Sequence, residues 1–276
     1  MTRRATKCGV WVAMLAAVAS AGCGNHTPPA AHERPPRVGG VGPSTAVHRC
    51  NEPGERSHAI RFRTRDGVTL TGAVVGSDPA AAVLIHEYPL DHCGWWPYAR
   101  YLARHGVRAL LFDLRCFGGS ACPTGRGHAT ADVAAAMAEL RRRGSRRIAL
   151  VGASMGGAIA VVAAAELHPA AVVNLSGEPD TAALTPGINA NARAAAPRVT
   201  APALFVVARG DRYVSAADMR SLARRVRSPS NRVIVLPAEA GHGWNMLYGT
   251  ATEWSPLARS VATFVRRHTV ITRGRS

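Results

Sequence analysis

From residue 58 onward, short hydrophobic runs alternate with segments of helical periodicity. Two stretches, 58–64 and 68–76, alternate apolar and polar residues around Asp66-Gly67, which predicts a β-hairpin. Six short, continuous apolar runs follow, and runs of this kind are typical of parallel strands buried on both faces. These runs are 80–86, 107–113, 147–153, 171–175, 203–208 and 232–236.

Five segments with apolar residues at helical spacing lie between or after these strands. They are 96–105, 131–143, 154–167, 216–226 and 256–268. The alternation predicts an α/β fold with an eight-stranded, mostly parallel sheet flanked by helices.

The N-terminal residues have the organisation of an export signal. Arg3, Arg4 and Lys7 precede an apolar run from Cys8 to about residue 19, and small residues follow. The run is shorter than the roughly 20 apolar residues that span a bilayer. We therefore predict a signal peptide at 1–22.

The residues around Cys23 allow two kinds of processing. Ala21-Gly22-Cys23 resembles the end of a bacterial lipobox, although Ser20 stands where leucine is usual. The sequence Ala19-Ser20-Ala21 also suits an ordinary signal peptidase. We expect Cys23 to be lipid-modified, so that the membrane is a partner and the protein lies at the outer face of the bacterial cell membrane. Secretion is the alternative.

A Pro-, Gly-, His- and Arg-rich stretch without periodicity then predicts a flexible linker over 23–57, and the folded domain is expected at 58–276.

Charge changes this picture little. The chain has 34 basic and 17 acidic residues, a formal charge of +17, and a single lysine, Lys7. Arginine is scattered along the chain, which favours a solvated surface, with attraction to acidic polymers or anionic lipid as the alternative. Nucleic acid is not an expected partner, because no basic cluster carries base-reading or stacking groups beside it.

The strongest candidate for chemistry is Gly152-x-Ser154-x-Gly156, which follows a predicted strand and opens a predicted helix. Such a turn is so tight that side chains at the two glycine positions would collide, and it projects the serine hydroxyl above the sheet edge. The alternative is a serine that merely caps the helix, but a cap does not require glycine on both sides.

A serine hydroxyl needs a base to take its proton, and the base needs an orienting group. Asp211 follows the predicted strand 203–208, and His242 lies between two glycines after 232–236. The carboxyl ends of parallel strands share one edge of a sheet, so both side chains are expected near Ser154. Asp218 competes with Asp211, but it falls inside a predicted helix.

The order Ser, Asp, His on eight strands resembles the α/β-hydrolase superfamily over about residues 58–268. The resemblance implies that Ser154 attacks an acyl carbon, that His242 acts as general base and then acid, and that Asp211 orients the imidazole. It implies a carboxylesterase acting on a small-molecule ester through an acyl-enzyme, without a cofactor. Many members of the superfamily insert a helical lid after the sixth strand, but only about 25 residues separate Ser176 from Pro202 here, so a minimal lid or none, and an open site, is expected. Serine peptidase, thioesterase, acyltransferase and non-catalytic binding lipoprotein are the alternatives.

The resemblance also suggests the groups around the nucleophile. Met155 and, by alignment of His86-Glu87 with the family's His-Gly, Tyr88 would donate the oxyanion-hole amides. His-Glu is similar to dienelactone-hydrolase-like members, whose glutamate lies close to the nucleophile. Glu87 is therefore expected as an acid/base group or substrate contact, or as a structural carboxylate. Three tryptophans are expected either to wall an acyl pocket or to pack in the core: Trp95, Trp96 and Trp244.

Besides Cys8 and Cys23, four cysteines remain, and export favours disulfides between them. No CxxC or HxxxH spacing is present, so a metal site is not expected, and no cysteine lies on a nucleophile turn. In the fold that the resemblance implies, the third and fourth strands are parallel neighbours. It thus implies a Cys93–Cys116 bridge, which leaves Cys50 with Cys122; a local Cys116–Cys122 loop is the rival.

Overall fold

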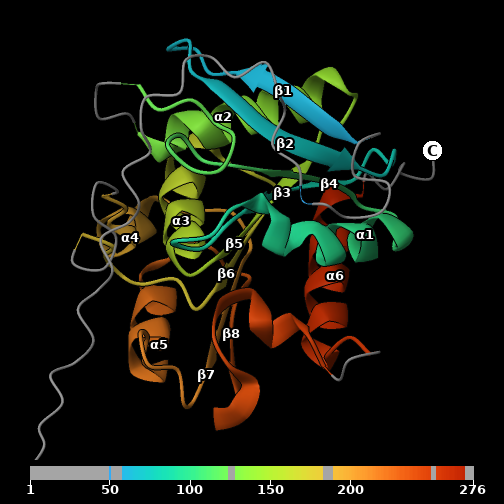
Figure 1. Cartoon of the computed structure of the whole chain (residues 1–276). Helices are drawn as coiled ribbons and strands as arrows, with labels where there is room; N and C mark the ends of the chain where they lie inside the picture. The colour runs from blue at the N-terminus through green and yellow to red at the C-terminus, as the bar shows by residue number, and fades with distance from the viewer. Residues whose placement is uncertain (1–49, 51–57, 124–127, 183–188, 250–252, 271–276) are drawn as a thin grey trace, which may run out of the picture. The chain divides into compact units, whose positions relative to one another are not determined.

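The computed structural model describes residues 50, 58–123, 128–182, 189–249 and 253–270, and all structural statements concern these. They form one eight-stranded sheet in the order β1-β2-β4-β3-β5-β6-β7-β8 (Figure 1). The strands are β1 (Ala59–Arg63), β2 (Thr69–Val75), β3 (Ala81–Ile85), β4 (Arg108–Phe112), β5 (Ile148–Ala153), β6 (Ala171–Leu175), β7 (Ala203–Ala208) and β8 (Asn231–Leu236).

Strand direction follows the hydrophobic pattern. The alternating segments form the antiparallel pair β1–β2, and β2 pairs antiparallel with β4. All later pairs are parallel. Every residue of β3 to β7 is buried, as expected for strands covered on both faces. The predicted α/β fold with a mostly parallel sheet is thus confirmed.

Helices cover both faces of the sheet (Figure 1). On one face lie α2 (Ala129–Arg142), α3 (Met155–Leu167) and α5 (Ala216–Arg225), and on the other α1 (Trp96–Arg104) and α6 (Pro256–Thr269). Each face has its own cluster of buried apolar side chains. The sequence did not predict the short helix α4 (Ala192–Ala195) or the 3₁₀ turns, which are η2 (His92–Trp95), η3 (Ala196–Arg198), η4 (Ala238–Ala240) and η5 (Gly243–Leu247).

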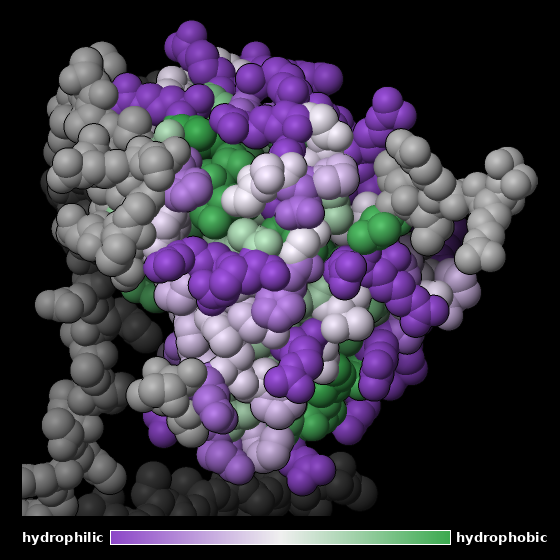
Figure 2. Space-filling view, turned by 90° about the vertical axis from the view of Figure 1, so that its right-hand side faces the viewer, coloured by the Kyte–Doolittle hydropathy of each residue, from purple (hydrophilic) through white to green (hydrophobic). Residues whose placement is uncertain are grey.

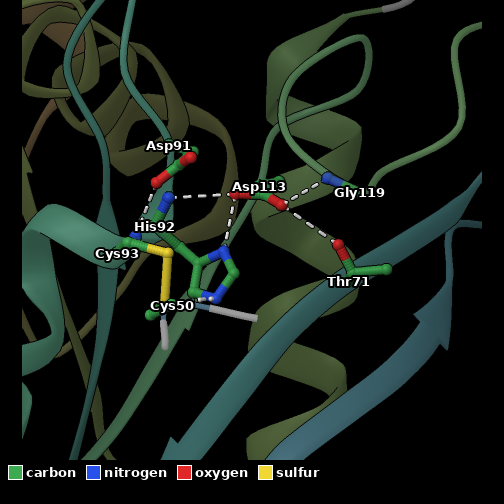
Figure 3. The surroundings of a disulfide bond; sticks show 7 residues. All are labelled: Cys50, Thr71, Asp91, His92, Cys93, Asp113 and Gly119. Atoms are coloured by element: carbon green, nitrogen blue, oxygen red, sulfur yellow. Dashed lines mark hydrogen bonds and ion pairs between the residues drawn. A yellow bond between two sulfur atoms is a disulfide. The ribbon is translucent and has the colours of Figure 1, made fainter. Parts of the chain in front are cut away.

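The disulfide pairing corrects the prediction. Cys50 is joined to Cys93, and Cys116 to Cys122, so the predicted Cys93–Cys116 and Cys50–Cys122 bridges were wrong and the local Cys116–Cys122 rival was right. The loop after β4 folds back on itself, because the amide of Cys116 donates to the carbonyl of Ala121 at 3.2 Å. This brings the two ends of the loop together. Cys93 lies instead on η2 and reaches Cys50, a residue of the predicted linker (Figure 3).

The molecular surface is mainly polar where Figure 2 views it. The face that lies on the right of Figure 1 is largely hydrophilic, and its hydrophobic residues appear in separate small patches. Within the described residues, no helix has the length and apolar character needed to cross a membrane. The predicted signal peptide at 1–22 and the lipidation residue Cys23 lie outside the described residues.

Candidate active site

Ser154 lies on a sharp turn between β5 and α3. Its backbone has φ 48° and ψ −122°, a strained conformation for a residue with a side chain. A Cβ added at Gly152 would lie 1.9 Å from the carbonyl oxygen of Gly156, and one at Gly156 would lie 2.2 Å from that of Ile85. Close backbone approach therefore explains why both positions are glycine, as the sequence predicts.

His242 and Asp211 form a hydrogen-bonded pair at the same edge of the sheet. Nδ1 of His242 lies 2.8 Å from Oδ2 and 3.0 Å from Oδ1 of Asp211. Burial alone would lower the pKa of His242, but Asp211 outweighs this effect and raises it. Burial would likewise raise the pKa of Asp211, yet hydrogen bonds from His242 and Ser176 hold it below its usual value. Bonding at Nδ1 leaves Nε2 of the neutral ring as an acceptor.

The Ser154 hydroxyl has a partner that the sequence did not predict. It donates to Oε1 of Glu178 at 3.0 Å, and in the described chain it makes no hydrogen bond to His242. Glu178 follows β6 by three residues and is 5% exposed. The available signal was an acidic residue just past the carboxyl end of a parallel strand. The sequence led to an expectation of a minimal lid in the segment after β6, but not to a role for Glu178.

Glu87, from the loop after β3, is a second buried carboxyl group in the site. Burial raises the pKa of Glu87 to about 7, and the amide of Trp244 donates to it. Among the described residues its Oε2 has no hydrogen-bond partner, and a Cβ at Gly243, next to His242, would lie 1.9 Å from this atom. Glu87 therefore packs beneath the loop that carries His242. Its predicted role as acid/base group or substrate contact stays a prediction.

The two residues expected to donate oxyanion-hole amides lie on different elements. Met155 is the first residue of α3, whose first amides have no partner within the helix. Tyr88 follows Glu87 in the loop after β3 and is partly buried. The preceding His86 ties this loop to the next one, because its Nε2 accepts from the amide of Leu114 at 3.2 Å.

The three candidate pocket tryptophans are core residues. Trp95, Trp96 and Trp244 are 0%, 1% and 5% exposed and belong to the cluster on the α1 and α6 face. Trp95 and Trp244 meet edge to face with ring centroids 5.4 Å apart. Their burial matches core packing. Exposed Tyr213 instead packs next to the candidate base, with its ring centroid 4.8 Å from that of His242.

A separate polar cluster surrounds the Cys50–Cys93 disulfide (Figure 3). Nδ1 of buried His92 lies 2.6 Å from Oδ1 of Asp113, and its Nε2 lies 3.3 Å from Sγ of Cys50. The two sulfur atoms and this ring nitrogen lie within 4.8 Å of one another, a spacing that metal ligands could adopt. Both sulfurs are joined in the disulfide, so they are not thiolate ligands in this structure.

Comparison with known proteins defines the class of this chain. A model of the alpha/beta hydrolase family matches residues 82–258. The chain therefore belongs to the alpha/beta hydrolase family, which agrees with the sheet order and with the turn at Ser154. No curated protein matches the sequence.

Solved structures of esterases and a lipase share the fold. A Pyrococcus furiosus esterase is 20% identical with a TM-score of 0.66, and the match covers 79% of this chain and 94% of the esterase. A Thermogutta terrifontis esterase is 20% identical with a TM-score of 0.59, over 77% and 99%. A Paleococcus ferrophilus monoacylglycerol lipase is 17% identical with a TM-score of 0.59, over 72% and 99%.

Proposed function

We propose that this protein is a serine hydrolase, a carboxylesterase that cleaves small or exposed acyl esters through Ser154, His242 and Asp211. The observation that carries the proposal is the His242–Asp211 hydrogen bond at the sheet edge where Ser154 leaves β5 on its strained turn. The esterases and the lipase that share the fold support this choice of reaction.

The proposed reaction has two halves. Nε2 of His242 takes the hydroxyl proton as Oγ of Ser154 bonds to the acyl carbon, and the amides of Met155 and Tyr88 stabilise the oxyanion. The same proton then passes to the leaving alcohol as the ester C–O bond breaks. Water, deprotonated by His242, then attacks the acyl carbon of the acyl-enzyme. His242 returns this proton to Oγ of Ser154 as the bond between Oγ and the acyl carbon breaks and the acid is released. Asp211 keeps the imidazole in its reactive tautomer throughout.

We propose that this enzyme is exported and works at the outer face of the cell membrane, anchored through a lipid on Cys23. The N-terminal charge, the apolar run and Ala21-Gly22-Cys23 support this proposal. The Cys50–Cys93 and Cys116–Cys122 bridges suit an oxidising compartment.

Hydrolysis of short p-nitrophenyl esters and labelling by a fluorophosphonate test the reaction. Ser154→Ala should lower kcat by at least about 10³-fold and abolish labelling, because no other atom replaces Oγ. Ser260→Ala is the matched control, because Ser260 lies exposed on α6 and should leave both unchanged. Full turnover in folded Ser154→Ala, judged by its circular dichroism spectrum, would refute the mechanism.

A further inference from the structure

Glu178 and His242 compete for one hydrogen atom. A serine hydroxyl has a single hydrogen to donate, and in this structure it points to Oε1 of Glu178. For the proposed reaction it must point to Nε2 of His242 instead. The ionisation state of Glu178 decides between these arrangements, because a carboxylate only accepts, whereas a neutral carboxyl group also donates.

We propose that Glu178 is a positioning residue that controls the direction of the Ser154 hydroxyl. Ionised Glu178 holds the hydroxyl hydrogen away from His242. Neutral Glu178 donates to Oγ, so that the hydroxyl is free to donate to Nε2 of His242. This inference rests on the proposed function and goes beyond the Ser-His-Asp arrangement.

The surroundings of Glu178 favour its neutral form. The side chain is buried, and Oε2 has no hydrogen-bond partner in the described structure. Burial raises the pKa of Glu178 more than the hydrogen bond from Ser154 lowers it. Among the described residues, ionisable side chains from neighbouring loops also affect its charge. Asp211 and Glu87 oppose its ionisation, and protonated His242 favours it.

The reactive form therefore has a neutral His242 and a neutral Glu178. In this form the two residues together hold one titratable proton, which is on the carboxyl group of Glu178. A second proton charges the imidazole, and loss of the last proton ionises Glu178. Because the two groups interact, the pair titrates with two apparent pKa values whichever residue is assigned each one. The expected profile of kcat/KM against pH is a bell, and above its upper pKa activity falls about tenfold per pH unit.

The test compares this profile in the wild type and in Glu178→Gln, with p-nitrophenyl acetate as substrate. A glutamine amide does not titrate, so the variant should lose the falling limb and reach a plateau. One pH unit above the upper wild-type pKa, the fall in the wild type should be about tenfold and that in Glu178→Gln absent. If Glu178→Gln does not fold, Glu178→Ala serves, because it also removes the titrating group.

Two control variants make the result specific. Asp180→Asn removes an exposed carboxylate from the same loop and should keep the bell. Glu87→Gln removes the other buried carboxyl group and should keep the falling limb.

Loss of the falling limb in Glu87→Gln, but not in folded Glu178→Gln or Glu178→Ala, would overturn the proposal, as would a wild-type profile without that limb. Absence of fluorophosphonate labelling in the wild type would instead overturn the proposed function. Labelling at Ser154 with an unchanged bell in the Glu178 variants would overturn only this inference.

Discussion

Burial of Glu87 carries a free-energy cost that depends on pH. In the unfolded chain this carboxyl group loses its proton near pH 4.5, whereas burial in the folded protein delays the loss to about pH 7. Between these values the unfolded state binds fewer protons, so folding stability falls as pH rises, and the full cost is present above pH 7. The difference corresponds to about 3 kcal/mol.

Glu87→Gln removes this titration. Its free energy of unfolding should exceed that of the wild type by up to about 3 kcal/mol at pH 8 and approach the wild-type value near pH 4.5. Urea unfolding at the two pH values measures the difference. Glu166→Gln, on the exposed side of α3, is the control and should change neither value. Equal stabilities of Glu87→Gln and wild type at pH 8 would contradict the assignment.

The sequence identified candidate site residues where the neighbouring residues form a recognisable pattern. Ser154, Asp211 and His242 each follow a strand that can be identified by its hydrophobic run, and two glycines mark the turn at Ser154. Glu178 has no such mark. Its importance comes from the path of the loop after β6, which brings Oε1 to the Ser154 hydroxyl and depends on tertiary packing.

Between elements, a buried arginine joins three segments of the chain. Arg115, after β4, bonds Oδ2 of Asp66 in the β1–β2 turn at 2.9 Å and Oδ1 of Asp132 on α2 at 2.7 Å. Asp132 is fully buried, and burial raises its pKa despite the opposing effect of Arg115. Without the guanidinium, this carboxyl group would be left buried and uncompensated.

Arg115→Met should therefore destabilise the protein by about 3–5 kcal/mol, because Asp132 loses its buried partner charge. Methionine is chosen because it fills much of the volume of the arginine side chain without its charge. Thermal unfolding at pH 7 measures the loss. Arg141→Met removes an exposed arginine from the last turn of α2 and should stay within about 0.5 kcal/mol of the wild type. An equal, small effect of both substitutions would mean that the buried ion pair contributes nothing.

Strands and helices were predicted well, because their hydrophobic periodicity extends over several residues. Disulfide pairing was predicted poorly, because it depends on how the loops fold. All eight strands and five main helices appear within one or two residues of their predicted bounds. The disulfides were mispaired because strand adjacency says little about loops. The segment from Gly118 to Ala121 turns back toward Cys116. Cys116 and Cys122 are also only six residues apart in the sequence, so closing a loop between them costs less entropy than closing the longer Cys93–Cys116 loop.

For the whole molecule, charge and lipid offer two different ways to hold the protein at a membrane. Cleavage after residue 22 would leave a charge of +14, since Arg3, Arg4 and Lys7 are removed. Such a charge attracts anionic lipid, but salt screens the attraction, with a Debye length of about 3 Å at 1 M. A diacylated cysteine holds through buried methylene groups, at about 0.8 kcal/mol each, and is insensitive to salt.

These mechanisms predict different behaviour of the full-length chain in a bacterial host. If Cys23 is lipidated, the protein should stay with the membrane fraction in 1 M NaCl and leave it only with detergent. Cys23→Ala should then be released into the soluble fraction, whereas Cys8→Ala, within the predicted signal peptide, should behave like the wild type. Mass spectrometry of the mature N-terminus would identify a diacylated Cys23 directly. Release of the wild type by 1 M NaCl would instead show that only electrostatic attraction holds it at the membrane. A free N-terminus at Gly22 would identify the secreted form.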